Sequence, residues 1–342
     1  MKLDFLYLPC GREKVTLLPG KRYLQEKGPA YRDAPTEALE EITRRVGEGI
    51  PWREAVRAYF EPNHKWLCDI ITHHSRDLFF RLQPPRSGAR VLDVGSGWGQ
   101  IARSLATRGF EVCALEPTTE RLNFIQATAE QEGVAEKMCF VGCAYQDVEF
   151  QEKFDLITAI GVLEWCGKFR EGTDPLTAQL DFLKKIRRDL NEGGSCVLGI
   201  ENRFGLKYWL GAAGDHTGVP GIEILEARLA RAQWQRSSGS ELRIFTYTMA
   251  EYREMLRTAG FQEIHFFAAF PDYKLPQQII AADEAEPLSD FFLRGGFVRE
   301  HDGSNGQLLS EDFQERLGSH YRSLADLGIV NLFSPSYFIT AC

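Results

Sequence analysis

The sequence predicts an α/β protein built on a mostly parallel β-sheet with helices on both faces. Between residues 90 and 200, short apolar runs alternate with segments whose apolar residues recur at helical intervals. A glycine-rich stretch directly follows the first apolar run, and glycines also end several of the helical segments. Such alternation is typical of parallel strands that are joined by crossover helices.

The first 85 residues are predicted to form a helical N-terminal cap. Apolar residues between Thr36 and Leu82 recur at helical spacing, as Leu39 and Ile42 do in its first helix. The chain has 342 residues, which is long enough for one large domain with additions. We place this domain at 86–342.

The strands and helices predicted for this domain follow one another along the chain. A strand at ARVLDV leads into the glycine loop, and a helix over 100–108 ends at Gly109. Thr248 and Glu251 form a capping-box pair that opens a later helix. Further strands are predicted at 111–115, 138–141, 154–160, 195–200, 261–270 and 336–341. Further helices are predicted at 119–132, 176–190 and 223–235.

The composition is that of an ordinary globular chain and argues against several kinds of partner. Forty basic against 48 acidic residues give a net charge of -8. The sequence has no dense Lys/Arg run of the kind that binds nucleic-acid phosphates. No apolar run reaches membrane-spanning length, and the first residues lack the apolar core of a signal peptide. The eight cysteines are scattered without metal-ligand spacing. We therefore expect a cytoplasmic protein with no metal site, no nucleic-acid partner and no membrane partner.

The stretch VLDVGSGWG carries the strongest functional signal. Gly95, Gly97 and Gly99 remove side chains where a strand turns into a helix, so a ligand can approach backbone amides at the helix N-terminus. Glu116 ends the next strand, where a carboxylate can accept hydrogen bonds from both hydroxyls of a ribose. A dinucleotide site of the G-x-G-x-x-G type needs a glycine where Gln100 stands, so that alternative fails.

With Asp93 before the loop and glycines spaced G-x-G-x-G, this stretch resembles motif I of class I S-adenosylmethionine-dependent methyltransferases. The order of elements over about residues 88–270 is similar to that family's order as well. The resemblance implies a Rossmann-like fold with a seven-stranded sheet whose last strand is antiparallel, and S-adenosylmethionine as the cofactor. It implies that the cofactor binds at Asp93, Gly95, Ser96, Gly97, Gly99, Glu116, Pro117, Ala144, Asp147, Ile160 and Trp165.

The same resemblance implies a role for each of these groups. Asp93 and the loop backbone hold the methionine end of the cofactor, and Glu116 binds its ribose. In the segment GCAYQDVEF, Ala144 and Asp147 flank the adenine. The segment FDLITAIGVLEW resembles motif IV, so residues 160–165 form a wall of the methyl-transfer site. Its tryptophan stands where many relatives have histidine, so this segment supplies no obvious base.

Two long connections, at 203–247 and 271–332, are predicted to cover the active site. Long connections in compact domains tend to be functional, and both of these leave carboxyl ends of strands. The first contains His216 beside Asp215. An imidazole titrates near neutral pH and a carboxylate can orient it, so this pair is the predicted catalytic base. The residues predicted to bind the acceptor are Arg203, Lys207, Tyr208 and Tyr273.

The sequence therefore predicts an O-methyltransferase that acts on a small polar, hydroxylated metabolite or sugar. The segments ENRFG, GDHTG and FPDYKLP resemble a bacterial subgroup associated with glycan and secondary-metabolite biosynthesis, which favours such an acceptor. N-, C- and phosphate-directed methyltransferases stay open because the cofactor motif does not report the acceptor. A catalytically silent, methyltransferase-like subunit of a partner protein also stays open, as does an oligomer.

Overall fold

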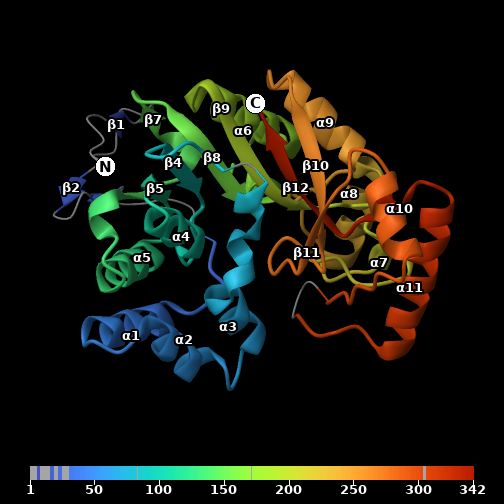
Figure 1. Cartoon of the computed structure of the whole chain (residues 1–342), viewed down its shortest axis with the longest axis horizontal. Helices are drawn as coiled ribbons and strands as arrows, with labels where there is room; N and C mark the ends of the chain where they lie inside the picture. Colours follow the sequence, from blue (N-terminus) through green and yellow to red (C-terminus); the bar gives the residue numbers. More distant parts are fainter. Residues whose placement is uncertain are drawn as a thin grey trace. The chain divides into compact units, whose positions relative to one another are not determined.

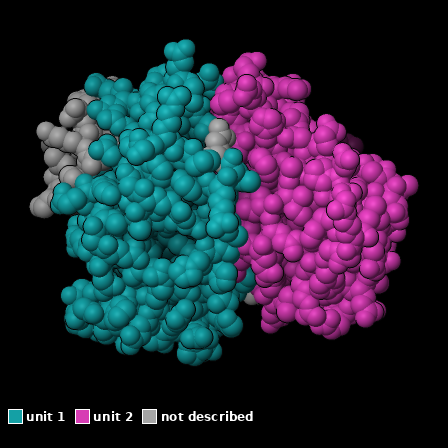
Figure 2. All heavy atoms as spheres, in the orientation of Figure 1, with its two compact units in different colours: residues 1–159, 185–196 teal, residues 160–184, 197–342 magenta. Residues whose placement is uncertain are grey.

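The computed structural model describes residues 31–82, 84–170, 172–302 and 306–342, and the backbone of 6–7, 16–18 and 22–24. The chain divides into two compact units (Figure 2). Unit 1 consists of Met1–Ala159 and Lys185–Cys196, and unit 2 consists of Ile160–Lys184 and Val197–Cys342. Each unit has its own strands, helices and buried side chains, so each is described by itself.

Unit 1 is built on parallel strands. The central strand β4 (Arg90–Val94) pairs in parallel with β5 (Glu111–Leu115) and with β8 (Phe154–Ile160), and β5 pairs with β6 (Met138–Gly142). These strands confirm the predicted parallel sheet. They are almost wholly buried, which explains why their sequences are continuous apolar runs rather than alternating ones.

Short strands that the sequence analysis did not predict add an edge to this sheet. The chain at β3 (Arg22–Leu24) pairs in parallel with β6, and β2 (Thr16–Leu18) pairs antiparallel with β3. A separate two-stranded sheet joins β1 (Leu6–Tyr7) to β7 (Glu149–Phe150). The first 24 residues therefore contain strands, whereas a wholly helical cap was expected.

The helices predicted between residues 36 and 82 are present in unit 1. They are α1 (Thr36–Gly47), α2 (Trp52–Phe60), α3 (Lys65–Thr72) and the 3-10 helix η1 (His74–Arg81). They pack beside α4 (Gln100–Thr107) and α5 (Thr119–Gln131), the two helices predicted after the glycine loop (Figure 1). Buried side chains of α1, α2 and α3 form one core cluster with Trp98 and with Phe124 of α5. This cluster joins the N-terminal helices to the glycine-loop segment.

Unit 2 contains the antiparallel end of the sheet. Strand β9 (Leu190–Glu201) runs from unit 1 into unit 2. β10 (Ile264–Phe270) pairs antiparallel with β12 (Ser336–Ala341) and with the unpredicted edge strand β11 (Gln278–Ala281). The expected antiparallel last strand is confirmed, and all seven predicted strands are present.

The long connections of unit 2 fold into helices. The connection after β9 contains α7 (Leu206–Trp209) and α8 (Ala227–Ser238), and the one after β10 contains α10 (Glu286–Leu293) and α11 (Glu311–Asp326). The predicted helix α9 (Met249–Thr258) opens with the predicted capping box between Thr248 and Glu251. The other helices are α6 (Pro175–Asp189) and the 3-10 turns η2 (Ala135–Lys137), η3 (Tyr145–Asp147), η4 (Leu163–Trp165) and η5 (Val330–Phe333). Across the described ranges, no helix combines the length and the apolar composition that crossing a bilayer requires.

Substitution of Gly99 tests how closely the loop and the helices of unit 1 pack. Its φ of 73° favours glycine, and an added Cβ would lie 2.6 Å from Cγ1 of Ile125. Gly99→Ala should therefore lower the free energy of unfolding by about 2–4 kcal/mol, from backbone strain together with overpacking. Urea denaturation measures this loss.

Gly88→Ala is the matched control. Gly88 has a similar φ of 75° but no atom within 4 Å of an added Cβ, so only the backbone strain of about 1–2 kcal/mol applies. Equal losses in the two variants would show that Ile125 does not restrict the loop.

Candidate functional site

The glycine loop of unit 1 joins β4 to α4 and contains three residues with positive φ, namely Gly95, Gly97 and Gly99. Ser96 holds the loop in place through two hydrogen bonds. Its amide donates a 3.0 Å hydrogen bond to the carbonyl of Leu115 at the end of β5, and its Oγ donates to the carbonyl of Asp93 at 2.9 Å. The loop backbone therefore lies across the carboxyl ends of β4 and β5, as the sequence predicts.

Glu116 is buried directly after β5, and two backbone amides hold its carboxylate. Gly97 N donates to Oε2 and Thr118 N donates to Oε1, each at 2.9 Å, and Pro117 lies between Glu116 and Thr118. Burial raises the pKa of Glu116, while the charge of Arg121 and the hydrogen bonds from Thr118 oppose that rise. The carboxylate predicted to bind a ribose is thus fixed at the edge of the glycine loop.

Asp93, the last residue but one of β4, has one carboxylate oxygen without a hydrogen-bond partner among the described residues. Oδ1 accepts a 2.6 Å hydrogen bond from Thr158 Oγ1, whereas Oδ2 is buried and has no hydrogen-bond partner in the described part of the chain. Burial raises the pKa of Asp93 to about 6, and the Thr158 hydrogen bond opposes this. Because an unsatisfied buried oxygen is costly, Oδ2 is suited to a ligand that donates hydrogen bonds.

The segment predicted to flank an adenine is anchored in unit 1. The amide of Asp147 donates to the carbonyl of Ala144 at 3.0 Å, which closes the turn η3 after β6. Inside this turn, the hydroxyl of Tyr145 donates to Asp189 at 2.8 Å, and both side chains are buried. Burial raises the pKa of the neighbouring Cys143 thiol to about 12. The segment is therefore well ordered, and its adenine contacts stay a prediction.

The segment that resembles motif IV continues from β8 into unit 2. Ile160 ends the strand, and the Gly161 amide donates to the carbonyl of Gly199 in β9 at 2.9 Å. The ring of Trp165 meets the His216 imidazole edge-on, with centroids 5.2 Å apart. Ile160 and Trp165 thus belong to unit 2, and their contact with a cofactor stays a prediction.

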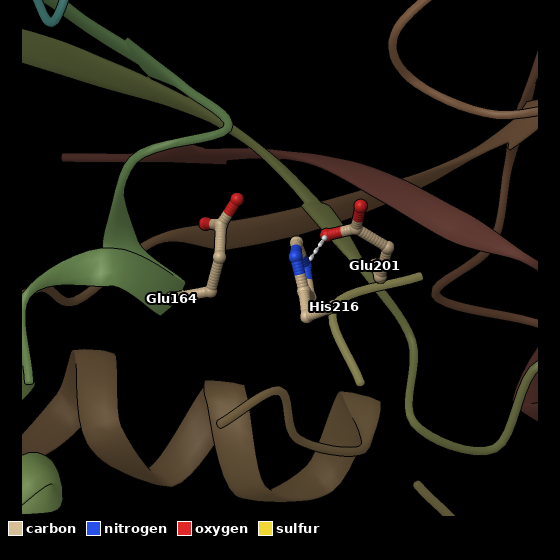
Figure 3. Close-up of side chains that lie close together, drawn as sticks. All are labelled: Glu164, Glu201 and His216. Carbon is tan, nitrogen blue, oxygen red and sulfur yellow. Dashed lines mark ion pairs between the residues drawn. The ribbon is translucent and has the colours of Figure 1, made fainter. Parts of the chain in front are cut away.

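Three side chains of unit 2 from separate segments form a carboxylate-histidine cluster: Glu164 of η4, Glu201 at the end of β9, and His216 of the following connection (Figure 3). One donor atom from each lies within 4.8 Å of the others. His216 Nε2 lies 3.4 Å from Glu201 Oε2. Of these three residues the sequence analysis singled out only His216. The signal for Glu201 was its place at the carboxyl end of a strand, and Glu164 lay inside the motif IV segment.

Asp215 does not orient His216, contrary to the sequence prediction. Its Oδ1 accepts from Lys207 Nζ at 2.8 Å, and its Oδ2 lies 3.4 Å from Lys274 Nζ. Lys274 also donates to Glu201 Oε1 at 2.5 Å. Because two ammonium groups engage Asp215, the carboxylate that pairs with His216 is Glu201 instead.

Burial and close charges shift the pKa values of the cluster in different directions. Burial and the charge of Glu201 raise the pKa of Glu164 to about 7, although the charge of His216 opposes the rise. Burial also opposes ionisation of Glu201, but Lys274 and His216 hold its pKa well below the usual range. Burial lowers the pKa of His216, whereas the charge of Glu201 outweighs this and raises it overall. Glu201 is therefore ionised, and its charge favours the protonated form of His216.

The residues predicted to bind an acceptor have partners within unit 2. Arg203 binds both oxygens of Glu251, at 2.9 and 3.2 Å. Lys207 is buried in its ion pair, and Tyr208 is buried beside it. The hydroxyl of Tyr273 lies 3.5 Å from Glu164 Oε1, to which it donates. Arg203 and Lys207 therefore position other side chains, and an anionic ligand would have to displace a carboxylate to reach them.

A pocket of about 590 Å³, part of it open to solvent, lies beside the cluster within unit 2. Buried apolar side chains make one wall, namely Ile222, Ala230, Leu242 and Phe245. The polar lining includes Glu201, Arg203, Asp215, His216 and Glu223. The pocket thus offers a small molecule an apolar surface and the exposed edge of the cluster.

Comparisons with known proteins identify the kind of chain. Residues 68–265 match the family model described as a methyltransferase domain. The tRNA 5-carboxymethoxyuridine methyltransferase of Escherichia coli K12 is 34% identical over 119 residues, which cover 34% of this chain and 42% of that protein. The ubiquinone biosynthesis O-methyltransferase of Rickettsia canadensis is 23% identical over 147 residues, 43% of this chain and 54% of that protein. The chain thus spans about half the length of these relatives.

Solved structures of low sequence identity resemble the chain in part. A cyclopropane synthase from Mycobacterium tuberculosis aligns with a TM-score of 0.46 at 18% identity, over 78% of this chain and 82% of that one. A phosphoethanolamine N-methyltransferase of Haemonchus contortus in complex with S-adenosylmethionine aligns with a TM-score of 0.43 at 17% identity, over 87% and 59%.

Lys274→Met tests the ion pairs that hold the cluster. Lys274 binds Glu201 and lies close to Asp215, and both carboxylates are buried. Because losing one partner leaves uncompensated buried charge, we expect the free energy of unfolding to fall by about 3–5 kcal/mol. Urea denaturation measures the loss.

Arg294→Met serves as the control for Lys274→Met. The ion pair of Arg294 with Asp290 is largely exposed, so removing it should change stability by less than about 1 kcal/mol. A loss at Lys274 that is no larger than the loss at Arg294 would contradict the role given to Lys274.

Proposed function

The chain belongs to the methyltransferase-domain family, and from this membership we propose that it methylates a hydroxyl of a small polar metabolite or sugar with S-adenosylmethionine. The main support for a hydroxyl as the acceptor group is the carboxylate-histidine cluster beside the pocket of unit 2. Glu164 Oε2 is buried and has no hydrogen-bond partner within the described ranges, and the buried atoms Glu201 Oε2 and His216 Nε2 form an ion pair of 3.4 Å. A hydroxyl is suited to such atoms because it donates a hydrogen bond and accepts one.

Unit 1 offers groups that fit the cofactor. When bound, S-adenosylmethionine supplies a methyl group on a positively charged sulfur. An acceptor oxygen can bond to this methyl carbon in line with the carbon-sulfur bond, which breaks to leave S-adenosylhomocysteine. The unpartnered Oδ2 of Asp93 suits the ammonium group of its methionine end. Glu116, held at the glycine loop by the Gly97 amide, suits the ribose hydroxyls. These two carboxylates and the loop are the parts of unit 1 that we assign to cofactor binding.

The pocket of unit 2 favours a hydroxylated acceptor without acidic groups. Arg203, Lys207 and Lys274 each bind a carboxylate of unit 2, so their charges are already compensated. A carboxylate or phosphate would enter among acidic side chains with no uncompensated cation from these three residues. For this reason we propose O-methyl transfer to a hydroxyl rather than transfer to a carboxylate or a phosphate, and a small-molecule acceptor rather than nucleic acid.

The residues around the cluster suit it to activating a hydroxyl. An attacking hydroxyl must lose its proton, and a group within hydrogen-bond reach must stabilise the ionised oxygen or accept that proton. Lys274 holds Glu201 through Oε1, which leaves Oε2 beside His216. Tyr273 likewise donates to Oε1 of Glu164. The chain thus fixes both carboxylates, so that an acceptor hydroxyl would meet groups that are already oriented.

We also propose that the protein works in the cytoplasm, in a biosynthetic pathway of the glycan or secondary-metabolite type. Cys342 is the one described cysteine that is not buried. Buried, scattered cysteines are typical of a reducing compartment.

Binding and turnover test the proposal separately. Wild-type protein should bind S-adenosylmethionine in a calorimetric titration and release S-adenosylhomocysteine with at least one member of a panel of sugars and polyols. His216→Ala should keep the cofactor affinity, because His216 lies in the acceptor pocket, and should lose turnover by about 10²–10⁴-fold.

His320→Ala is the matched control, since His320 is an exposed histidine of α11 outside the pocket. Its turnover should equal that of the wild type. Absence of cofactor binding would refute the proposed activity. Full turnover in His216→Ala would refute the role of the cluster, and a bound cofactor without turnover on any hydroxylated compound would refute O-methyl transfer.

Asp93 should make cofactor binding depend on pH. Burial raises its pKa to about 6 against the hydrogen bond from Thr158, with smaller effects of Arg76, which lowers it, and Glu116, which raises it. The ionised carboxylate is the form that binds an ammonium group. Below about pH 6 the free protein must release a proton to bind, so the Kd should rise by about tenfold per pH unit, whereas above pH 6 it should level off.

Calorimetric titrations from about pH 5 to pH 8 check this dependence. Asp93→Asn should bind more weakly and show a flatter profile. Glu116→Gln belongs in the same series because burial also raises the pKa of Glu116. An unchanged profile in Asp93→Asn would show that another group is responsible.

A further inference from the structure

The geometry points to a second ligand of unit 2: we propose that Glu164, Glu201 and His216 bind a divalent metal ion of the Mn²⁺ or Zn²⁺ type. From the sequence we expected no metal site, because the cysteines are scattered without metal-ligand spacing. These three ligands come instead from η4, from the end of β9 and from the connection that follows β9. Only the folded chain brings them together (Figure 3).

The first argument is distance. One oxygen or nitrogen atom from each side chain lies within 4.8 Å of the other two, and His216 Nε2 is 3.4 Å from Glu201 Oε2. Atoms that bind one ion at about 2.1 Å lie roughly 3–4 Å apart. Small side-chain rotations therefore suffice to bring the three atoms onto a single ion.

The second argument is unsatisfied polarity. Glu164 and Glu201 are 1% and 2% exposed, and each has an oxygen, Oε2, without a hydrogen-bond partner among the described residues. His216 Nε2 is buried as well, and it lies 3.4 Å from Glu201 Oε2. A buried atom of this kind destabilises the fold unless a ligand satisfies it. A shared proton links two such atoms, whereas a metal ion satisfies all three at once.

The third argument is the support behind each ligand. Metal ligands are usually oriented by outer partners. Lys274 donates to the other oxygen of Glu201, and Tyr273 donates to the other oxygen of Glu164. The edge-on contact with Trp165 braces the imidazole of His216. Each ligand therefore has a neighbour that limits its rotation and leaves the unpartnered atom available.

Charge also favours a cation at this position. Glu164, Glu201 and Asp215 supply three carboxylates, whereas Lys207 and Lys274 supply the ammonium groups in direct contact with two of them. With His216 neutral, as a metal ligand must be, ionisation of all three carboxylates leaves one negative charge uncompensated among these groups. A divalent ion next to Glu164 compensates it without disturbing either ion pair.

The donor set indicates which ions fit. Carboxylate oxygens suit Mg²⁺, Ca²⁺ and Mn²⁺, and an imidazole nitrogen suits Zn²⁺ and other transition metals. A mixed set with one nitrogen therefore favours Mn²⁺ or Zn²⁺ over Ca²⁺, which takes six to eight oxygens. Three protein ligands leave positions open for an acceptor oxygen, and a bound ion makes a hydroxyl easier to ionise. His216 then acts as a ligand rather than as the base; this role rests on the proposed function, whereas ion binding does not.

Electron paramagnetic resonance with Mn²⁺ tests the site on the intact protein. Loss of the free Mn²⁺ signal should show one saturable equivalent per chain after removal of endogenous metal. Spin-echo modulation of the bound ion should show coupling to a nitrogen, which a surface carboxylate site does not produce. Glu164→Gln and His216→Ala should each raise the Kd for Mn²⁺ by at least about tenfold.

Glu300→Gln is the matched control. Glu300 is another buried carboxylate of unit 2 with an unpartnered Oε2, but it bonds to Tyr321 and is not part of the cluster. This variant should keep the wild-type Kd. Circular dichroism spectra of all variants establish that they are folded, and the wild-type nitrogen coupling needs no variant at all.

Several outcomes would overturn the metal site. These are the absence of saturable Mn²⁺ or Zn²⁺ binding, binding without nitrogen coupling, and an equal loss of affinity in Glu300→Gln. The cofactor titration is independent of them: Mn²⁺ binding without S-adenosylmethionine binding would refute the proposed function and support the site. Turnover that is unchanged in metal-free protein would refute the role of the ion in activating the acceptor.

Discussion

The arrangement of the cluster in unit 2 depends on the buried ion pair between Lys274 and Glu201. A carboxylate this deeply buried stays ionised only if a cation compensates it, and Lys274 Nζ lies 2.5 Å from its Oε1. The same ammonium group reaches Asp215, which Lys207 also binds. These contacts fix Glu201 so that its second oxygen meets His216. Lys207, Lys274 and Asp215, which are not members of the cluster, thus set its orientation.

Unit 1 fixes its carboxylates by a different means. Glu116 carries two hydrogen bonds from backbone amides, and Asp93 carries one from Thr158. Backbone amides thus hold Glu116 in addition to the charge of Arg121, and the hydrogen bond to Asp93 comes from a neutral hydroxyl. A positively charged ligand can therefore approach Asp93 without first displacing a lysine from it. Unit 1 is built to accept a cationic, hydrogen-bonding ligand, whereas the cations of unit 2 are already compensated.

The sequence predicted the features that depend on local order and missed those that depend on tertiary contacts. The seven main strands and the glycine loop were predictable because apolar runs, glycines and Glu116 are close together in the chain. Strands β2, β3 and β11 were not, since they have only three or four residues and form by pairing at sheet edges. The partner of His216 was also missed. Sequence adjacency suggested Asp215, but the carboxylate that meets the imidazole is set by where Lys207 and Lys274 fold.

The same reasoning bears on what the pocket can recognise. Arg203 and Lys207, the two cations predicted to bind the acceptor, turn out to be bound to carboxylates of their own unit. Recognition then depends on groups that still have bonding capacity, and these are Glu164 Oε2, Glu201 Oε2 and His216 Nε2. All three are best satisfied by a cation or by a donor of hydrogen bonds. An acceptor hydroxyl bound next to a metal ion meets both needs, because the ion occupies the three atoms and the oxygen completes its coordination.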